Sequence, residues 1–479
     1  MLRDSAWATV SLTVPAVTHL MVRLYVGREL GQDALGLYSL AFAAYSIAMV
    51  FGTLGTGTAL TRHVAQVPTR PITQDRLLLV GVAQSALAGA AVAFMLAILS
   101  RPLSCNVFGM PQMHGLLLIT SFALPGAAVG KAVLGYLNGR RRFGWYAVVS
   151  VTQSALIIVI TFGLISAGYG VTGAMAGFLV PISFTGLASL SLGRRAIGAM
   201  PKSSPQPRFS SGIIRFGLFV TMINSVGVLQ SYTDTVMTGA FLNERELGAY
   251  AASLLVLEAL RFPSTAVRLA LTPRIASMWS SPDVAELTRV VNLTIACIAT
   301  IVIPLGFAII IGAESLLYYG FGQGFESAST ALIILVPGGM SMGVWSAVGA
   351  LLSVTGHVRT AFKYVLGTAA ANAALNVVLI PSFGITGAAI ATTTTLCLGC
   401  LLQTRAVQHK TGVTVSWKRP VLTGSVLTLG GTMLALVDVG TGSFFHIALW
   451  WLGATCLCGA ALLPWSISKQ LVQWLARPR

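Results

Sequence analysis

Long apolar stretches, separated by short segments that carry most of the charges, run through almost the whole sequence. Each stretch is about 20 residues long, the length at which an α-helix crosses the hydrocarbon core of a bilayer. Only 9% of the 479 residues are charged, and the mean hydropathy is +0.81. A chain of this length and hydropathy consists of many membrane spans and not of one large buried core. The sequence therefore predicts an all-α, polytopic membrane protein.

We expect about fourteen transmembrane helices. The first resembles a signal peptide, but it ends in Arg23 and lacks a small-residue cleavage site, so we interpret it as a retained span. The expected spans cover residues 5–26, 36–60, 77–99, 113–137, 145–167, 171–193, 213–239, 247–271, 289–311, 328–353, 361–381, 384–403, 420–438 and 444–466.

The net charge of +17 reflects membrane topology. When the loops are assigned alternately to the two sides of the membrane, one side holds most of the 30 Lys and Arg residues, and both termini lie on that side. The opposite side holds only Arg28, Arg101 and Arg245. Basic residues are retained on the cytoplasmic side, so we predict a multi-pass protein of the cytoplasmic (inner) membrane with both termini in the cytoplasm. This distribution predicts a lipid bilayer, and no nucleic acid, as the partner of the basic surface.

Two parts of the chain repeat each other at an offset of 212 residues. Six residues match at this offset: Gly27, Leu30, Gly36, Tyr38, Thr53 and Arg62 match Gly239, Leu242, Gly248, Tyr250, Thr265 and Arg274. The repeat predicts two pseudo-symmetric six-helix lobes in the same orientation, with a polar cavity between them. The expected domains are an N-terminal lobe (1–195), a cytoplasmic linker (196–212), a C-terminal lobe (213–405), two extra C-terminal helices (417–468) and a cytoplasmic tail (469–479).

Several ionisable residues fall inside the expected spans, where charge is costly and marks function. Four of them are cations that we expect to bind the phosphates of an anionic ligand: Arg23, Lys131, Arg261 and Arg268. Asp234 and Glu258 are the expected charge partners and gating residues, with Asp234 near Arg23 and Glu258 on the same helix face as Arg261. The alternative is that these groups form internal salt bridges or snorkel to the interfaces.

Pro263, two residues after Arg261, is a candidate hinge because proline removes a helix hydrogen bond. We find no nucleotide-binding loop, no catalytic constellation and no cluster of metal ligands that is compatible with the topology. The sequence therefore predicts a protein that is not an enzyme and that needs no metal or cofactor.

Several stretches resemble the polysaccharide-transport flippases of the multidrug/oligosaccharidyl-lipid/polysaccharide (MOP) exporter superfamily. They are Arg23 to Tyr38 with Gly27, Leu35 and Gly36, Asp234 with Gly239 and Gly248-x-Tyr250, Gly135 to Arg142, and the related turns at 170–174 and 384–388. The resemblance implies transport of polyprenyl-pyrophosphate oligosaccharides from the inner to the outer leaflet by alternating access of two six-helix lobes. It also implies that cations such as Arg23 and Arg261 engage the pyrophosphate. Fourteen spans depart from the twelve that are commonest in this superfamily.

Our leading interpretation is therefore a flippase for a lipid-linked oligosaccharide in surface-polysaccharide or cell-wall export. We expect it to work as a monomer, with polysaccharide polymerase or assembly proteins as candidate partners. Two alternatives stay open. The first is a drug or organic-cation efflux transporter of the same superfamily. The second is a non-transporting membrane scaffold of a glycan assembly complex.

Overall fold

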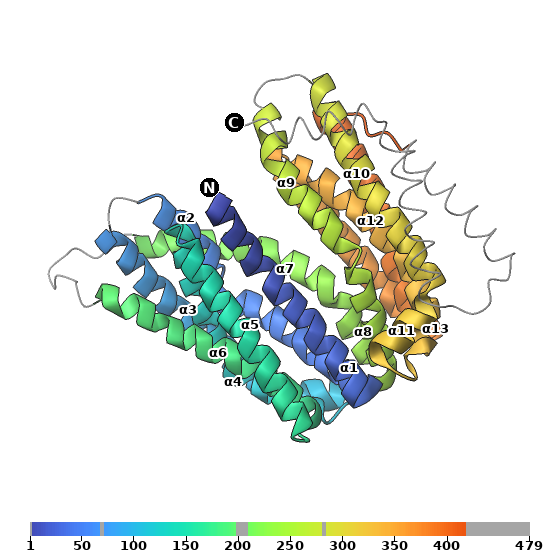
Figure 1. Cartoon of the computed structure of the whole chain (residues 1–479), viewed down its shortest axis with the longest axis horizontal. Coiled ribbons are helices and arrows are strands. Elements are labelled where there is room, and N and C mark those ends of the chain that lie inside the picture. Colours follow the sequence, from blue (N-terminus) through green and yellow to red (C-terminus); the bar gives the residue numbers. More distant parts are fainter. Residues whose placement is uncertain (1, 68–70, 198–208, 280–283, 418–479) are drawn as a thin grey trace, which may run out of the picture. The chain divides into compact units, whose positions relative to one another are not determined.

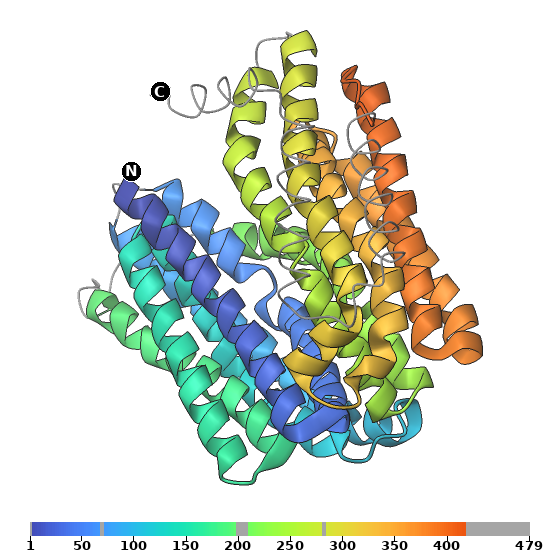
Figure 2. The same ribbon diagram turned by 45° about the vertical axis from the view of Figure 1, so that its right-hand side comes forward.

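The structure is a computed structural model that describes residues 2–67, 71–197, 209–279 and 284–417 (Figures 1 and 2). All regular elements within these ranges are helical, so the prediction of an all-α fold is confirmed. In chain order they are α1 (Leu2–Thr53), α2 (Thr56–Ala65), α3 (Pro71–Pro102), the π-helix η1 (Leu103–Val107), α4 (Met113–Gly139), α5 (Phe143–Ser166), α6 (Gly170–Ile197), α7 (Phe209–Phe241), α8 (Glu244–Glu258), α9 (Arg261–Trp279), α10 (Val284–Ile311), α11 (Ala313–Phe321), the 3-10 helix η2 (Phe325–Ala328), α12 (Ser329–Val354) and α13 (Val358–Thr411).

The predicted spans that end at or before residue 403 all fall on helices. The helix α13 contains two predicted spans, and α1 contains the first span and most of the second. The second span continues into α2, and the predicted eighth span is shared by α8 and α9. The last two spans, within 417–468, and the tail, 469–479, lie outside the described residues except for residue 417, and so does most of the predicted linker.

The two longest helices must change direction because of their length. With 52 residues, α1 would be about 78 Å long if it were straight, more than twice the thickness of the hydrocarbon core. Its backbone leaves the helical conformation at Gly31 (φ 81°, ψ −171°), and the 54-residue α13 does so at Gly384 (φ 58°, ψ −139°). Glycine adopts these positive φ values without steric cost. Each long helix is therefore a pair of helices joined at a glycine.

Apolar side chains cover much of the outer surface of the helices. Phe122 is 84% exposed, Leu87 74% and Val159 67%, each in the middle of a long helix. Within the described ranges, nine helical segments are long and apolar enough to cross a membrane. Such exposure in mid-helix is what a surrounding hydrocarbon phase stabilises. The chain is therefore a multi-pass membrane protein.

By its internal packing the chain divides into two compact units, Met1–Gly248 and Ala249–Arg479. In the first unit α4 is central and packs against α1, α2, α3 and α6, while α7 packs against α1 and α2 (Figures 1 and 2). In the second unit α12 packs against α9, α10 and α13. The first unit thus extends past the predicted linker and includes α7. The two pseudo-symmetric six-helix lobes stay a prediction.

One helix crossing in the first unit supports the internal repeat. The backbone of α1 meets the start of α8 so closely that a Cβ atom on Gly36 would collide with the carbonyl oxygen of Glu244. A Cβ atom on Gly248 would in turn collide with the carbonyl oxygen of Gln32. The offset of 212 that relates Gly36 to Gly248 also relates Gln32 to Glu244. The same close backbone contact is therefore made by residues at matching positions of the sequence repeat.

Candidate functional site

Arg23 lies on the first half of α1, inside the predicted first span, and is partly buried. Its guanidinium carbon is 4.4 Å from the centre of the Phe42 ring, which is on the second half of α1. The kink at Gly31 explains this contact, because Arg23 lies eight residues before the kink and Phe42 eleven residues after it. At 1.5 Å per residue the two positions are about 12 and 17 Å from the turn, so their side chains can meet at similar depth.

Arg23 has no carboxylate partner among the described residues, and its buried Nε atom donates no hydrogen bond to them. Asp234, the predicted partner, is on α7 and only 7% exposed, and no described ion pair joins it to Arg23. The positive charge of Arg23 is thus held against an aromatic ring and is not neutralised by an acid. Cation–π contacts of this kind contribute about 0.5–2 kcal/mol and leave the N–H donors available.

Phe42 is the centre of an aromatic cluster in the first unit. Its ring contacts five others, at centroid distances between 5.3 and 6.5 Å. These rings come from both halves of α1, from α6 and from α7: His19, Tyr38, Tyr45, Phe178 and Tyr232. Tyr38 and Phe178 are almost fully buried, whereas Phe42 and Tyr232 keep part of their surface exposed.

Lys131 lies on α4, eight residues before the end of that helix. Its side chain is exposed. Lys131 lies on the face of α4 opposite Phe122, because nine residues at 100° per residue make two and a half turns. Phe122 is the most exposed apolar side chain of α4 and marks the side that faces lipid. The helix that carries Lys131, α4, packs against α1, the helix that carries Arg23. The structure thus places two of the four predicted cations, Arg23 and Lys131, on neighbouring helices of the first unit.

The other predicted site residues belong to the second unit. The predicted eighth span is broken, since α8 ends at Glu258 and α9 begins at Arg261, with the turn Ala259–Leu260 between them. Pro263 explains the break, because its ring nitrogen cannot donate to the carbonyl of Ala259. Glu258 is partly buried and Arg261 is exposed, and these two described residues form no ion pair with each other.

Arg268, the fourth predicted cation, lies on α9. The structure describes its backbone only.

A buried polar cluster in the second unit was not predicted. Asn372 on the first half of α13 donates to Thr392 and Thr395 on the second half, each at 3.5 Å, and accepts a bond of 3.2 Å from Asn376. The Tyr250 hydroxyl lies 3.5 Å from Thr392. Uncharged side chains do not stand out in an apolar run. The spacing was nevertheless a usable signal, because Asn372 and Asn376 are four residues apart and fall on one helix face.

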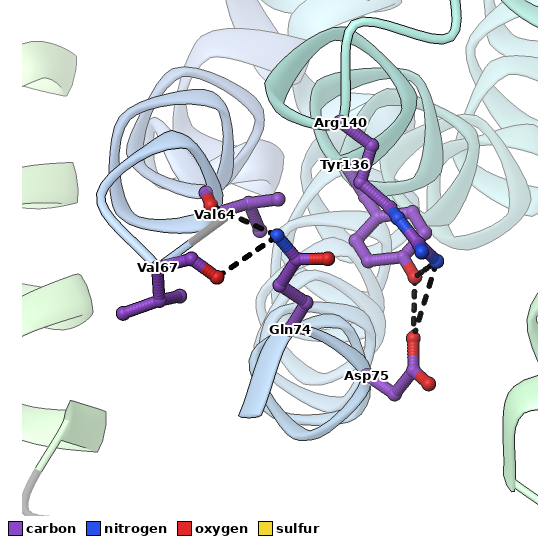
Figure 3. Close-up of polar contacts among 6 residues, drawn as sticks. All are labelled: Val64, Val67, Gln74, Asp75, Tyr136 and Arg140. Atoms are coloured by element: carbon purple, nitrogen blue, oxygen red, sulfur yellow. Dashed lines mark hydrogen bonds and ion pairs between the residues drawn. The ribbon is translucent and has the colours of Figure 1, made fainter. Parts of the chain in front are cut away.

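A second polar cluster joins the ends of α2, α3 and α4 (Figure 3). The Tyr136 hydroxyl donates to Asp75 and accepts a hydrogen bond of 2.7 Å from Arg140, and Arg140 lies 3.7 Å from Asp75. Next to Asp75, the Gln74 amide donates to the carbonyls of Val64 and Val67, at 3.3 and 3.1 Å. These bonds tie the start of α3 to the last turn of α2 and to the residues that follow it.

The fold and the site together define a class: an all-helical, multi-pass membrane protein whose spans contain cations, of which Arg23 has no carboxylate partner in the part of the chain that the structure describes. A family model described as polysaccharide biosynthesis protein matches residues 1–279, more than half of the chain. The chain therefore belongs to the polysaccharide biosynthesis protein family.

Among curated proteins, the chain is 22% identical over 387 residues to the probable low-salt glycan biosynthesis flippase Agl15 of Haloferax volcanii. The match covers 79% of this chain and 77% of Agl15.

Among solved structures, the fold is similar to that of the lipid II flippase MurJ in an inward closed conformation. The TM-score is 0.77 at 17% identity, with 98% of this chain and 100% of MurJ covered. An inward-facing multidrug resistance MATE family transporter of the MOP superfamily gives a TM-score of 0.67 at 14% identity, covering 85% of this chain and 98% of the transporter. These similarities show that the fold is that of the MOP transporters.

Proposed function

We propose that this protein is a flippase that moves a lipid-linked, polyprenyl-pyrophosphate oligosaccharide from the inner to the outer leaflet of the cytoplasmic membrane. The observation that carries the proposal is Arg23, a cation inside a membrane span that faces an aromatic ring and has no carboxylate partner among the described residues. An unpaired charge at this depth is costly unless a ligand of opposite charge visits it. The family and the similarity to Agl15 and MurJ support a ligand that is a lipid-linked glycan.

In this mechanism the cations bind the pyrophosphate in sequence. Lys131, Arg261 and Arg268 receive it from the inner leaflet, and Arg23 holds it nearer the outer surface. Asp234 and Glu258 are the candidate gating residues, and the bend before Pro263 allows α9 to move relative to α8. Both termini lie in the cytoplasm, and the two six-helix lobes alternate between inward-open and outward-open states around the site.

The membrane potential is sufficient to give the movement a direction. Moving about two negative charges outward through about 100 mV is favourable by roughly 4–5 kcal/mol. Flipping therefore needs no dedicated coupling ion, and a monomer is sufficient. Polysaccharide polymerase or assembly proteins are the expected partners on the outer side.

The test is transport by the full-length protein in proteoliposomes with a fluorescent polyprenyl-pyrophosphate disaccharide. We expect the protein to expose this lipid on the opposite leaflet and to do so faster when an inside-negative potential is imposed. A lipophilic cation dye is tested in parallel. Transport of the dye and not of the pyrophosphate lipid would replace the proposal by organic-cation efflux, and transport of neither would favour a scaffold.

A further inference from the structure

We propose that Phe42 is a positioning residue for Arg23. The π face of the Phe42 ring holds the Arg23 guanidinium in place, so that its N–H donors stay free for a phosphate. This inference rests on the proposed function for the identity of the ligand but not for the geometry. It assigns a role to an apolar residue that carries no charge and no hydrogen-bonding group.

The first argument is that a carboxylate would be the wrong partner for Arg23. A bidentate carboxylate occupies the same N–H fork that binds a phosphate and neutralises the charge that attracts it. A ligand would then have to displace the carboxylate before binding. The Phe42 ring, 4.4 Å from the guanidinium carbon, stabilises the cation by contact with the flat face of the guanidinium. The N–H donors at the edge of the guanidinium stay unoccupied.

The second argument is that Phe42 is itself held in place. Its ring lies 5.6 Å from His19, 5.3 Å from Phe178 and 6.1 Å from Tyr232, measured between centroids. These neighbours belong to three different helices, α1, α6 and α7. A ring packed on several sides keeps one orientation, and that orientation fixes the place of the cation above it.

The third argument is that Arg23 has little else to hold it. Its Nε atom is buried and donates no hydrogen bond to the described residues. A long, flexible side chain without a fixed partner would lose the geometry needed to bind a pyrophosphate, and ordering it during binding would weaken the affinity. The aromatic contact removes that cost in advance.

The experiment compares Phe42→Leu with Phe42→Tyr in the full-length protein, using farnesyl pyrophosphate as the probe and farnesol as its uncharged control. We expect Phe42→Leu to weaken binding of the pyrophosphate by about 2- to 30-fold and Phe42→Tyr to leave it unchanged. In an Arg23→Gln background Phe42→Leu should have no further effect. An equal loss in both backgrounds would overturn the positioning role.

Phe162→Leu is the matched control, since it removes a ring of the first unit that stacks on Tyr25 at 4.0 Å and has no described contact with Phe42 or the Arg23 guanidinium. We expect it to lower thermal stability without changing the dependence of binding on Arg23. A direct readout is the Arg23 Nε–H resonance in protein labelled with ¹⁵N-arginine and assigned by its loss in Arg23→Lys. The Phe42 ring should shift this resonance upfield in the wild type and in Phe162→Leu but not in Phe42→Leu.

The two readouts separate the two proposals. If the wild type does not bind farnesyl pyrophosphate but its Arg23 resonance is shifted and responds to Phe42→Leu, the positioning contact stands and the proposed ligand is wrong. If the wild-type resonance is not shifted, Phe42 does not position Arg23, whatever the ligand.

Discussion

Tyr136→Phe tests whether the polar cluster at the ends of α3 and α4 stabilises the first unit. The change removes one hydroxyl that donates to Asp75 and accepts from Arg140 at 2.7 Å. A hydrogen bond to a charged group contributes about 1.5–3 kcal/mol, which sets an upper limit of about 3–6 kcal/mol for the two bonds. Asp75 and Arg140 keep 14% and 24% of their side-chain surfaces exposed, so water and their own contact at 3.7 Å recover part of the loss. We therefore expect a net destabilisation of about 2 kcal/mol.

The assay is equilibrium unfolding in mixed micelles of dodecyl maltoside and sodium dodecyl sulfate. Tyr169→Phe is the control, because Tyr169 is 64% exposed at the turn before α6. It should change the free energy of unfolding by less than about 0.5 kcal/mol. If Tyr136→Phe is no more destabilising than Tyr169→Phe, the cluster does not hold the helix ends together.

Three further predictions concern other parts of the chain. Gly36→Ala should destabilise the protein by about 1–3 kcal/mol in the same unfolding assay, because the added methyl group collides with the Glu244 carbonyl. The control is Gly115→Ala, which should be neutral or stabilising because its Cβ atom meets open space. Pro263→Ala restores an N–H donor for the carbonyl of Ala259, so amide hydrogen exchange at 259–262 should be slower than in the wild type. Unchanged exchange would mean that proline does not cause the break. Burial and the neighbouring Arg62 charge lower the pKa of His63 below its ordinary value of 6.5. The contribution of neutral His63 to stability is therefore complete above pH 6.5 and is lost as the pH falls. Between pH 7.5 and 5, the free energy of unfolding should decrease less in His63→Gln than in the wild type.

The spans were predictable because the transfer of an apolar run into hydrocarbon depends on that run alone. The same holds for the break near Pro263, since the missing N–H is a local property of proline. The sequence placed a bend there, and the structure locates it at Ala259–Leu260. The kinks at Gly31 and Gly384 likewise follow from helices too long to cross the membrane once.

The partners of the buried charges were not predictable in the same way. Similar depth suggested that Arg23 would meet Asp234, but depth does not determine which side of a helix faces which neighbour. The partner of Arg23 is Phe42, which is nineteen residues away and is brought close by the turn at Gly31. Phenylalanine in an apolar run carries no sign of such a role. The same reasoning explains the unpredicted cluster around Asn372, whose members become neighbours only when α13 folds back on itself.

The most direct test of the central claim is the rate at which the fluorescent polyprenyl-pyrophosphate disaccharide is flipped by Arg23→Gln compared with Arg28→Gln. Both changes remove one arginine charge from the first half of α1, but Arg28 is exposed near the kink at Gly31. Loss of a charge-assisted hydrogen bond to the pyrophosphate corresponds to about a 10- to 150-fold decrease in affinity for the lipid. Arg23→Gln should therefore raise the KM for flipping by this factor, whereas Arg28→Gln should retain the wild-type KM. Equal rates and KM values for the two variants would show that Arg23 does not bind the transported lipid.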